Sequence, residues 1–363
     1  MGAPGAGGNG GDVRDFGDDG QLARLVERAA ALRQVVAGEA GGLAAIGRIL
    51  GSRRDLTRAD REMLLGWQDD AVRGVFEVRA AAVTAGRPAI TASLVDDLEY
   101  RVYGLSARLA AGMFLSGTLL PVTADGTAWL TSGTETTHPA SAAPRVARLA
   151  IDMATREPDL VFRNPEKVRQ GWEHMRRDRE EFLAFFGADE LVLPTLEAEG
   201  RLNAYYKRRR DAALAARGRH RAVSESGETT FVMPPGFFEF DTVGIIYDDV
   251  DGFVVVPEYG MLRALFADPA LAADRAHADV LRAYLREDTI PPLPLRRLAA
   301  AYPHNADAVF RRVLGNRSFT WSEHGDRLLR KRKPGYYESG PLPGVAVLSD
   351  RVLELARLRK GRM

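Results

Sequence analysis

Three aspartates stand close together in a short turn between two apolar runs. They are Asp248, Asp249 and Asp251, and Glu258 follows just beyond the second run. Clustered carboxylates suit Mg²⁺ or Mn²⁺, because these hard cations prefer oxygen ligands. One hypothesis is therefore a site for metal-dependent phosphoryl transfer or hydrolysis, with Mg or Mn as the cofactor. The alternative is a solvated turn in which Asp and Gly serve only the backbone geometry.

Two other segments combine basic and aromatic residues late in predicted helices. The first consists of Tyr205, Tyr206, Lys207, Arg208, Arg209 and Arg210. The second consists of Arg330, Lys331, Arg332, Lys333, Tyr336 and Tyr337. Clustered cations release counterions from phosphates, and aromatic rings stack on exposed bases. These clusters predict a nucleic-acid-binding surface. The alternative is that the helix dipole favours the cations and that the tyrosines pack in the core.

The distribution of charge along the chain favours a surface that binds a polyanion. The 363-residue chain has a net charge of +1, yet residues 296–363 contain 15 basic and 6 acidic residues. The C-terminal part is therefore basic while the rest of the chain is acidic, which a near-neutral total conceals. A basic face of this kind attracts polyanions.

Several classes of site are excluded by composition and motif. The chain has no cysteine, which rules out disulfides, thiolate metal sites and cysteine nucleophiles. The six histidines include no pair at metal-ligand spacing on one predicted helix. Phosphate-binding loops, dinucleotide fingerprints and the nucleophile elbow of hydrolases are also absent from the sequence.

The spacing of apolar residues predicts helices that lead into a β-rich stretch. Residues 21–36 have helical spacing, and Thr57 with Asp60 marks a second helix start. Between residues 75 and 137 the pattern changes to short runs rich in Val, Thr, Tyr, Phe and Leu. Short strands at regular spacing predict a small barrel or sandwich, although residues 98–103 also fit a helix.

Helices resume after the β-rich stretch. Asn164 before Pro165 predicts a helix start, and Gly187 is expected to end that helix. Residues 191–193 fit a short strand, and residues 196–216 fit a helix that becomes basic near its end.

The C-terminal third is expected to contain a hairpin followed by helices. The apolar runs 242–247 and 253–256 predict a buried β-hairpin whose turn is the acidic segment. Helix starts are expected at Asp268, Asn305, Thr320 and Ser349.

Together these patterns predict an α+β protein. A helical N-terminal segment leads into a small antiparallel β-barrel-like module, and a mostly helical region with a buried β-hairpin follows. The expected divisions are a disordered tail (1–20), helices with the barrel module (21–137), a helical region (138–216), a linker or loop (217–230) and a hairpin with helices and a basic C-terminal part (231–363).

The leading hypothesis is a soluble, cytoplasmic binding protein without a cofactor. The sequence shows no secretory signal and no membrane-spanning segment, so no membrane partner is expected. Its basic C-terminal face would bind nucleic acid or an acidic protein partner. The alternatives are a metal-dependent enzyme at the acidic turn and a protein–protein assembly factor, and the fold alone does not choose among them.

Overall fold

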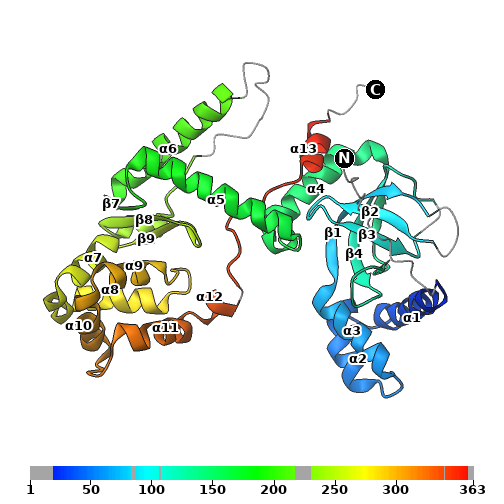
Figure 1. Ribbon diagram of the computed structural model, residues 1–363, viewed down its shortest axis with the longest axis horizontal. Helices are drawn as coiled ribbons and strands as arrows, with labels where there is room; N and C mark the ends of the chain where they lie inside the picture. Colours follow the sequence, from blue (N-terminus) through cyan, green and yellow to red (C-terminus); the bar gives the residue numbers. More distant parts are fainter. Residues whose placement is uncertain (1–18, 83–86, 106–107, 217–229, 339, 359–363) are drawn as a thin grey trace, which may run out of the picture. The chain divides into compact units, whose positions relative to one another are not determined.

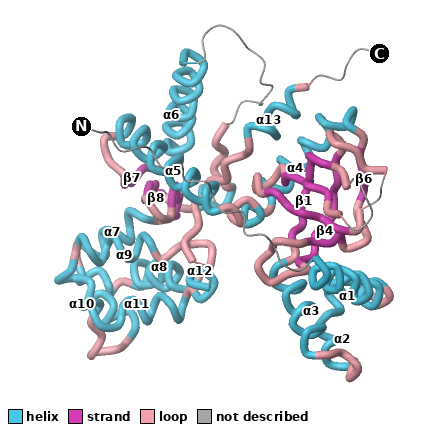
Figure 2. Tube along the Cα trace, turned by 45° about the vertical axis from the view of Figure 1, so that its right-hand side comes forward, coloured by secondary structure: helices cyan, strands magenta, loops and turns pink. Residues whose placement is uncertain are grey.

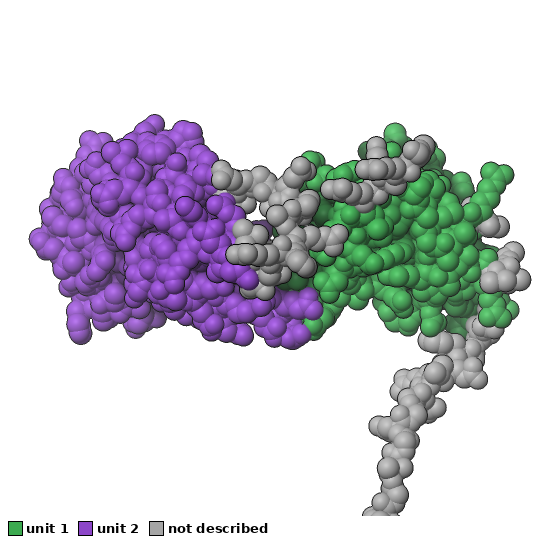
Figure 3. Space-filling model, turned by 90° about the horizontal axis from the view of Figure 1, so that it is seen from above, with its two compact units in different colours: residues 1–167, 346–363 green, residues 168–345 purple. Residues whose placement is uncertain are grey.

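The computed structural model describes residues 19–82, 87–105, 108–216, 230–338 and 340–358. The chain divides into two compact units, unit 1 (residues 1–167 and 346–363) and unit 2 (residues 168–345), which are coloured separately in Figure 3. Unit 2 is one uninterrupted run of chain between two segments of unit 1. The predicted tail and linker fall outside the described residues, except for Asp19, Gly20 and Thr230.

Unit 1 begins with three helices that share a core with part of a β-sheet. They are α1 (Asp19–Ala37), α2 (Ile46–Ser52) and α3 (Arg58–Asp70). The predicted start of α3 is confirmed, because the Thr57 Oγ1 accepts from the Asp60 amide and Asp60 accepts from the Thr57 amide. The Trp67 indole donates to the Pro121 carbonyl at 2.8 Å, which joins α3 to the sheet.

Five strands of unit 1 form a closed barrel (Figure 1). The strands of this sheet are β1 (Val72–Ala80), β2 (Ala89–Ser93), β3 (Glu99–Tyr103), β4 (Phe114–Pro121), β5 (Trp129–Thr131) and β6 (Thr136–His138). Their order is β1-β2-β3-β5-β4, β1 pairs with β4 to close the ring, and β6 extends β4. The predicted barrel is thus confirmed, but β3 and β5 run parallel rather than antiparallel. Residues 98–103, which also fitted a helix, contribute β3.

The barrel encloses a packed aromatic core. The ring of Tyr100 lies edge-on to those of Phe76 and Trp129, with centroids 5.6 and 5.1 Å apart. The Tyr100 hydroxyl donates to the buried Asp96 carboxylate at 2.7 Å. Burial raises the pKa of this tyrosine, and the nearby Asp96 charge adds to the shift. The interior is therefore core, and the outer surface of the barrel is where a ligand has access.

Two helices pack together beside the barrel. They are α4 (Ala143–Arg156) and α13 (Asp350–Arg357). Val352 and Leu355 of α13 lie in the same buried apolar cluster as α4. Ser349 caps α13, as predicted, because its Oγ accepts from the Val352 amide at 2.9 Å. Residues 346–363, which include α13, belong to unit 1.

Unit 2 is built in three layers (Figures 1 and 2). The middle layer is an antiparallel sheet of β7 (Glu190–Pro194), β8 (Thr242–Asp248) and β9 (Gly252–Pro257). One face of the sheet packs on α5 (Pro165–Phe186) and α6 (Thr195–Ala216). Gly187 ends α5 in a left-handed conformation, with φ of 78°, as expected of a helix-ending glycine. The predicted buried hairpin is confirmed as β8–β9.

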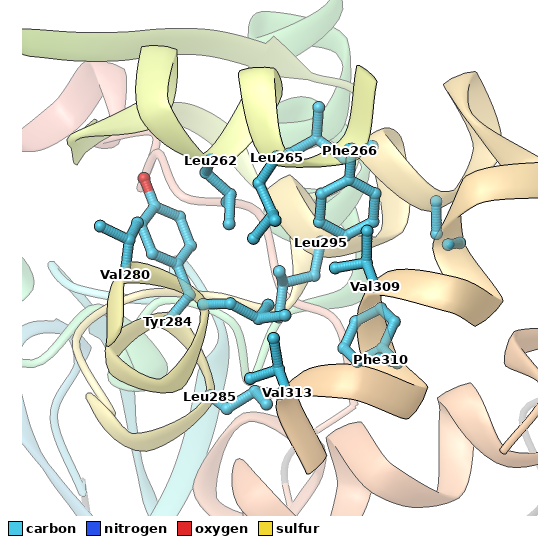
Figure 4. Packing of buried hydrophobic residues seen from close by; sticks show 14 of the residues in the cluster. Leu262, Leu265, Phe266, Val280, Tyr284, Leu285, Leu295, Val309, Phe310 and Val313 are labelled. Carbon is cyan, nitrogen blue, oxygen red and sulfur yellow. The ribbon is translucent and has the colours of Figure 1, made fainter. Parts of the chain in front are cut away.

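A helical layer covers the other face of the sheet. Its helices are α7 (Tyr259–Ala267), α8 (Arg275–Arg286), α9 (Leu293–Ala301), α10 (Pro303–Leu314), α11 (Trp321–Arg332) and α12 (Pro334–Glu338). Figure 4 shows part of their core, a buried apolar cluster that includes Leu262, Phe266 and Phe310. Ile246 and Val256 of the hairpin belong to the same cluster, so the sheet has an apolar core on each face.

Three of the four expected helix starts after the hairpin differ in detail. The predicted helix from Asp268 is interrupted, because Asp268 caps only a short 3₁₀ helix and Asp274 caps α8. Asn305 lies inside α10 and donates instead to the carbonyls of Phe266 and Ala267. Thr320 does precede α11, but the Trp321 amide donates to Asp307 at 2.7 Å and no side-chain cap forms from Thr320. The Thr320 hydroxyl instead donates to the Glu323 carboxylate at 3.1 Å.

Short 3₁₀ helices complete the described elements. They are η1 (Gly42–Ala45), η2 (Ala140–Ala142), η3 (Pro158–Leu160), η4 (Pro235–Glu239) and η5 (Pro269–Ala273). None of the helices in the described part of the chain is long and apolar enough to cross a membrane.

Candidate functional site

The two tyrosines of the first basic cluster belong to the core between α6 and the sheet. Tyr205 is 2% exposed, and its ring lies 5.6 Å from that of Phe182. Burial raises the pKa of Tyr205 to about 12. The ring of Tyr206 packs against the same cluster, 5.2 Å from that of Tyr205. Neither ring is free to stack on a base while this core is folded.

The cations of the first cluster differ in their surroundings. Arg209 forms ion pairs with Asp178 and Glu181, the latter at 2.6 Å. The Arg208 guanidinium lies over the Phe185 ring, 5.6 Å from its centroid. Lys207 and Arg210 are exposed, and neither forms an ion pair with another described residue. Two cations of this cluster are therefore available to a ligand.

The second cluster likewise mixes structural and available cations. Arg330 pairs with Asp326 at 2.7 Å and lies over the Tyr337 ring at 4.6 Å. Lys333 is buried and donates to the Glu287 carbonyl, and burial lowers the pKa of its ammonium. Lys331 and Arg332 are exposed and form no ion pair within the described residues.

The tyrosines after the second cluster are held by polar partners. The Tyr336 hydroxyl donates to Asp251 at 2.6 Å, and Arg296 donates to the Tyr337 hydroxyl at 2.7 Å. Burial raises the pKa of both tyrosines. Their contacts join α12 to the acidic turn and to α9, which is a structural role.

The structure does not bring the two basic clusters together. The first lies on α6, in the layer on one face of the unit 2 sheet, and the second lies at the end of α11, in the opposite layer (Figures 1 and 2). A single flat ligand surface therefore cannot contact both.

The acidic turn is bonded to the surrounding protein. Asp248 accepts from the Val250 amide at 2.9 Å and forms an ion pair with Arg297 at 3.1 Å. Burial opposes ionisation of Asp248, but these donors outweigh burial and lower its pKa. Asp251 accepts from Tyr336 instead, and there burial dominates and raises the pKa. Two of the three aspartates thus have structural partners.

The metal hypothesis also includes Asp249 and Glu258. Asp249 points outward with a 65% exposed side chain and approaches Arg179 at 3.5 Å. Glu258 precedes α7 in a left-handed conformation, with φ of 53°, and burial raises its pKa. Among the described residues, no group of three or more Asp, Glu or His side chains is placed to hold a metal ion. The geometry of the turn therefore gives the metal hypothesis no support.

One charge network at this turn is invisible in the sequence pattern. Arg297 of α9 contacts Asp189 at 3.2 Å as well as Asp248, and Arg179 of α5 contacts Asp189 at 2.5 Å. These guanidiniums neutralise aspartates just before β7 and at the end of β8. No local spacing relates residues so far apart in the chain, so these ion pairs could not be predicted from the sequence.

Comparison with known protein families, with curated proteins and with solved structures gives no match for this chain.

Proposed function

We propose that the protein binds a polyanion, with the phosphate backbone of nucleic acid as the preferred ligand, through the exposed cations of α11. These are Arg327, Lys331 and Arg332, here called the α11 ridge. The observation that carries the proposal is that Arg327 and Lys331 are four residues apart, exposed, and without an ion-pair partner among the described residues. Like charges at this spacing repel each other, and an anion bound between them would relieve that repulsion.

The ridge supports contact with phosphates rather than with bases. The tyrosines that follow it are held by Asp251 and Arg296, so they do not present free stacking surfaces. Binding through point charges alone reads no sequence. The helix dipole accounts for cations in the last turn, such as Lys331 and Arg332, but Arg327 lies one turn earlier, where the dipole effect has faded.

The test measures the affinity of the full chain for a short DNA duplex as a function of salt. With three phosphates neutralised, affinity should fall about 40-fold between about 50 and about 200 mM salt. The triple change Arg327→Gln, Lys331→Gln and Arg332→Gln should weaken binding to any sequence and flatten this salt dependence.

A matched control uses three exposed cations of α6, in the opposite layer. The triple change Arg201→Gln, Lys207→Gln and Arg210→Gln removes the same charge and should leave the affinity nearly unchanged. Equal losses in the two triple variants would mean that net charge, not the ridge, attracts the polyanion. An unchanged affinity in the ridge variant would remove α11 from the proposal. Polyglutamate that competes better than DNA would favour an acidic protein partner.

A further inference from the structure

A hollow of about 400 Å³ opens on the outer surface of the unit 1 barrel. It is lined by Arg79, Ala92, Ser93, Leu94, Asp97, Glu99 and Arg351. Small-molecule sites typically have volumes of roughly 300–1,000 Å³, so the hollow has the size of a small ligand. It lies in unit 1 and shares no residue with the α11 ridge, so it is independent of the function proposed above.

The strand register explains why there is a hollow at this place. Glu77 of β1 lies opposite Ala92 of β2, and Ala92 lies opposite Glu99 of β3. The three residues form one row on the outer face, because partners in a register point to the same side of a sheet. The small alanine in the middle leaves a floor between two longer side chains.

One wall of the hollow carries guanidinium groups. Arg351 of α13 donates to both oxygens of Glu77, at 3.0 and 2.6 Å, and Arg79 approaches the same carboxylate at 3.2 Å. Glu77 is 3% exposed, whereas the side chains of Arg79 and Arg351 are 43% and 34% exposed. A guanidinium has five N–H donors, so the bonds from both arginines to Glu77, and the further bond from Arg351 to Glu354 at 2.7 Å, hold the guanidiniums in place and leave other N–H groups of each for a ligand.

The opposite wall carries carboxylates. Asp97, at the β2–β3 turn, has a left-handed φ of 62° and is held by the buried Lys167 at 2.7 Å. Glu99, the first residue of β3, is exposed and forms no ion pair with any described residue. Arg79 belongs to β1 and Glu99 to β3, and the backbones of these two strands are two strand spacings, or about 9.5 Å, apart. The side chains of both residues line the hollow.

We propose that this hollow binds a small dipolar molecule with one carboxylate and one ammonium group, such as an amino acid. The carboxylate would accept from Arg79 and Arg351, and the ammonium would donate to Glu99 and Asp97. Each contact is a charge-assisted hydrogen bond. A simple anion would form only the contacts with the guanidinium groups, and a simple cation only those with the carboxylates, so each should bind more weakly than the dipolar molecule.

The test titrates the full chain with glycine, β-alanine and the longer ω-amino acids up to aminohexanoate, followed by calorimetry. The alkanoate and the alkylamine with the same number of carbons serve as probes that lack one charge. At least one amino acid should bind about tenfold or more tightly than both of its single-charge counterparts, as expected for losing one charge-assisted contact. The proposal fails if no amino acid binds below about 10 mM, or if an alkanoate or alkylamine binds equally well.

Two variants and one control locate the site. Arg79→Gln and Glu99→Gln alter exposed side chains on opposite walls. Each should lower the affinity for the tightest-binding amino acid about tenfold. Arg101→Gln changes an exposed arginine of β3, two residues beyond Glu99, that does not line the hollow. It should leave the affinity within about twofold of the wild type. Binding that is unchanged in Arg79→Gln and Glu99→Gln, or equally weakened in Arg101→Gln, would overturn the assignment.

Discussion

At the scale of single residues, the sequence correctly marked positions rich in charge but not what each charge does. The acidic turn predicted from the sequence is present, but its aspartates have different partners. Asp248 pairs with an arginine, and Asp251 accepts from a tyrosine hydroxyl. Glu77 and Arg351 are 274 positions apart in the chain and form a bidentate pair. Charge content is readable from composition, whereas pairing depends on tertiary contacts that no local spacing encodes.

Asp251 gives a pH test of the acidic turn. Its pKa is raised in the folded protein, so the folded state binds this proton more tightly than the unfolded state does. Stability should therefore decrease as pH rises from the ordinary aspartate pKa to the raised value, and then level off. Asp251→Asn lacks this decrease and should be more stable than the wild type at pH 7, but not in acid. Urea denaturation of the wild type and the variant, at pH 7 and in acid, measures the difference in their free energies of unfolding.

Asp249→Asn is the control for that experiment. Asp249 is exposed, so its change should alter the free energy of unfolding by at most about 0.5 kcal/mol, with no effect of added Mg²⁺. A loss of stability in Asp251→Asn at pH 7 would show instead that the hydrogen bond from Tyr336 to a charged carboxylate outweighs burial.

At the scale of elements, local signals predicted the barrel, the hairpin and several helix ends. Thr57, Gly187 and Ser349 behave as their types suggest, because caps act within one helical turn. Asn305 and Thr320 do not. Asn305 lies inside α10 and donates to the carbonyls of Phe266 and Ala267, and the Thr320 hydroxyl donates to Glu323 instead of accepting from the helix. The parallel pairing of β3 with β5 could not be predicted, since the alternation of side chains along a strand does not specify which neighbour the strand pairs with.

Helix α13 provides the test at this scale. Leu355 is buried against α4, so Leu355→Ala should destabilise unit 1 by about 2–5 kcal/mol through lost burial and a cavity. Leu358, three residues later, is 50% exposed, and Leu358→Ala should change stability by less than about 0.5 kcal/mol. Chemical denaturation of the two variants measures both. Equal effects would mean that α13 does not pack on α4 in solution.

At the scale of the whole molecule, the division into units is the property that the sequence revealed least. Turn residues and composition mark loops, but they do not show that residues 346–363 return to unit 1 after the whole of unit 2. That return depends on contact between an apolar face of α13 and an apolar face of α4. The sequence of an amphipathic helix does not specify which element its apolar face packs against.

The four tryptophans make this division measurable. Trp67 and Trp129 lie in unit 1, and Trp172 and Trp321 lie in unit 2. Removing residues 346–363 should lower the unfolding midpoint reported by the first pair and leave that of the second pair in place. Variants that keep one pair, with phenylalanine at the other two positions, report each unit separately. A common shift of both signals would show that the two units unfold as one.

The interruption of unit 1 also imposes an order on events at the ribosome. The chain must extend through residues 168–345 before α13 exists to cover α4. At about 5–20 residues per second, this takes roughly 10–40 s, far longer than small domains need to fold. During that interval the face of α4 that later packs against Val352 and Leu355 lacks this cover, so we expect the partly synthesised chain to bind chaperones that shield apolar surface.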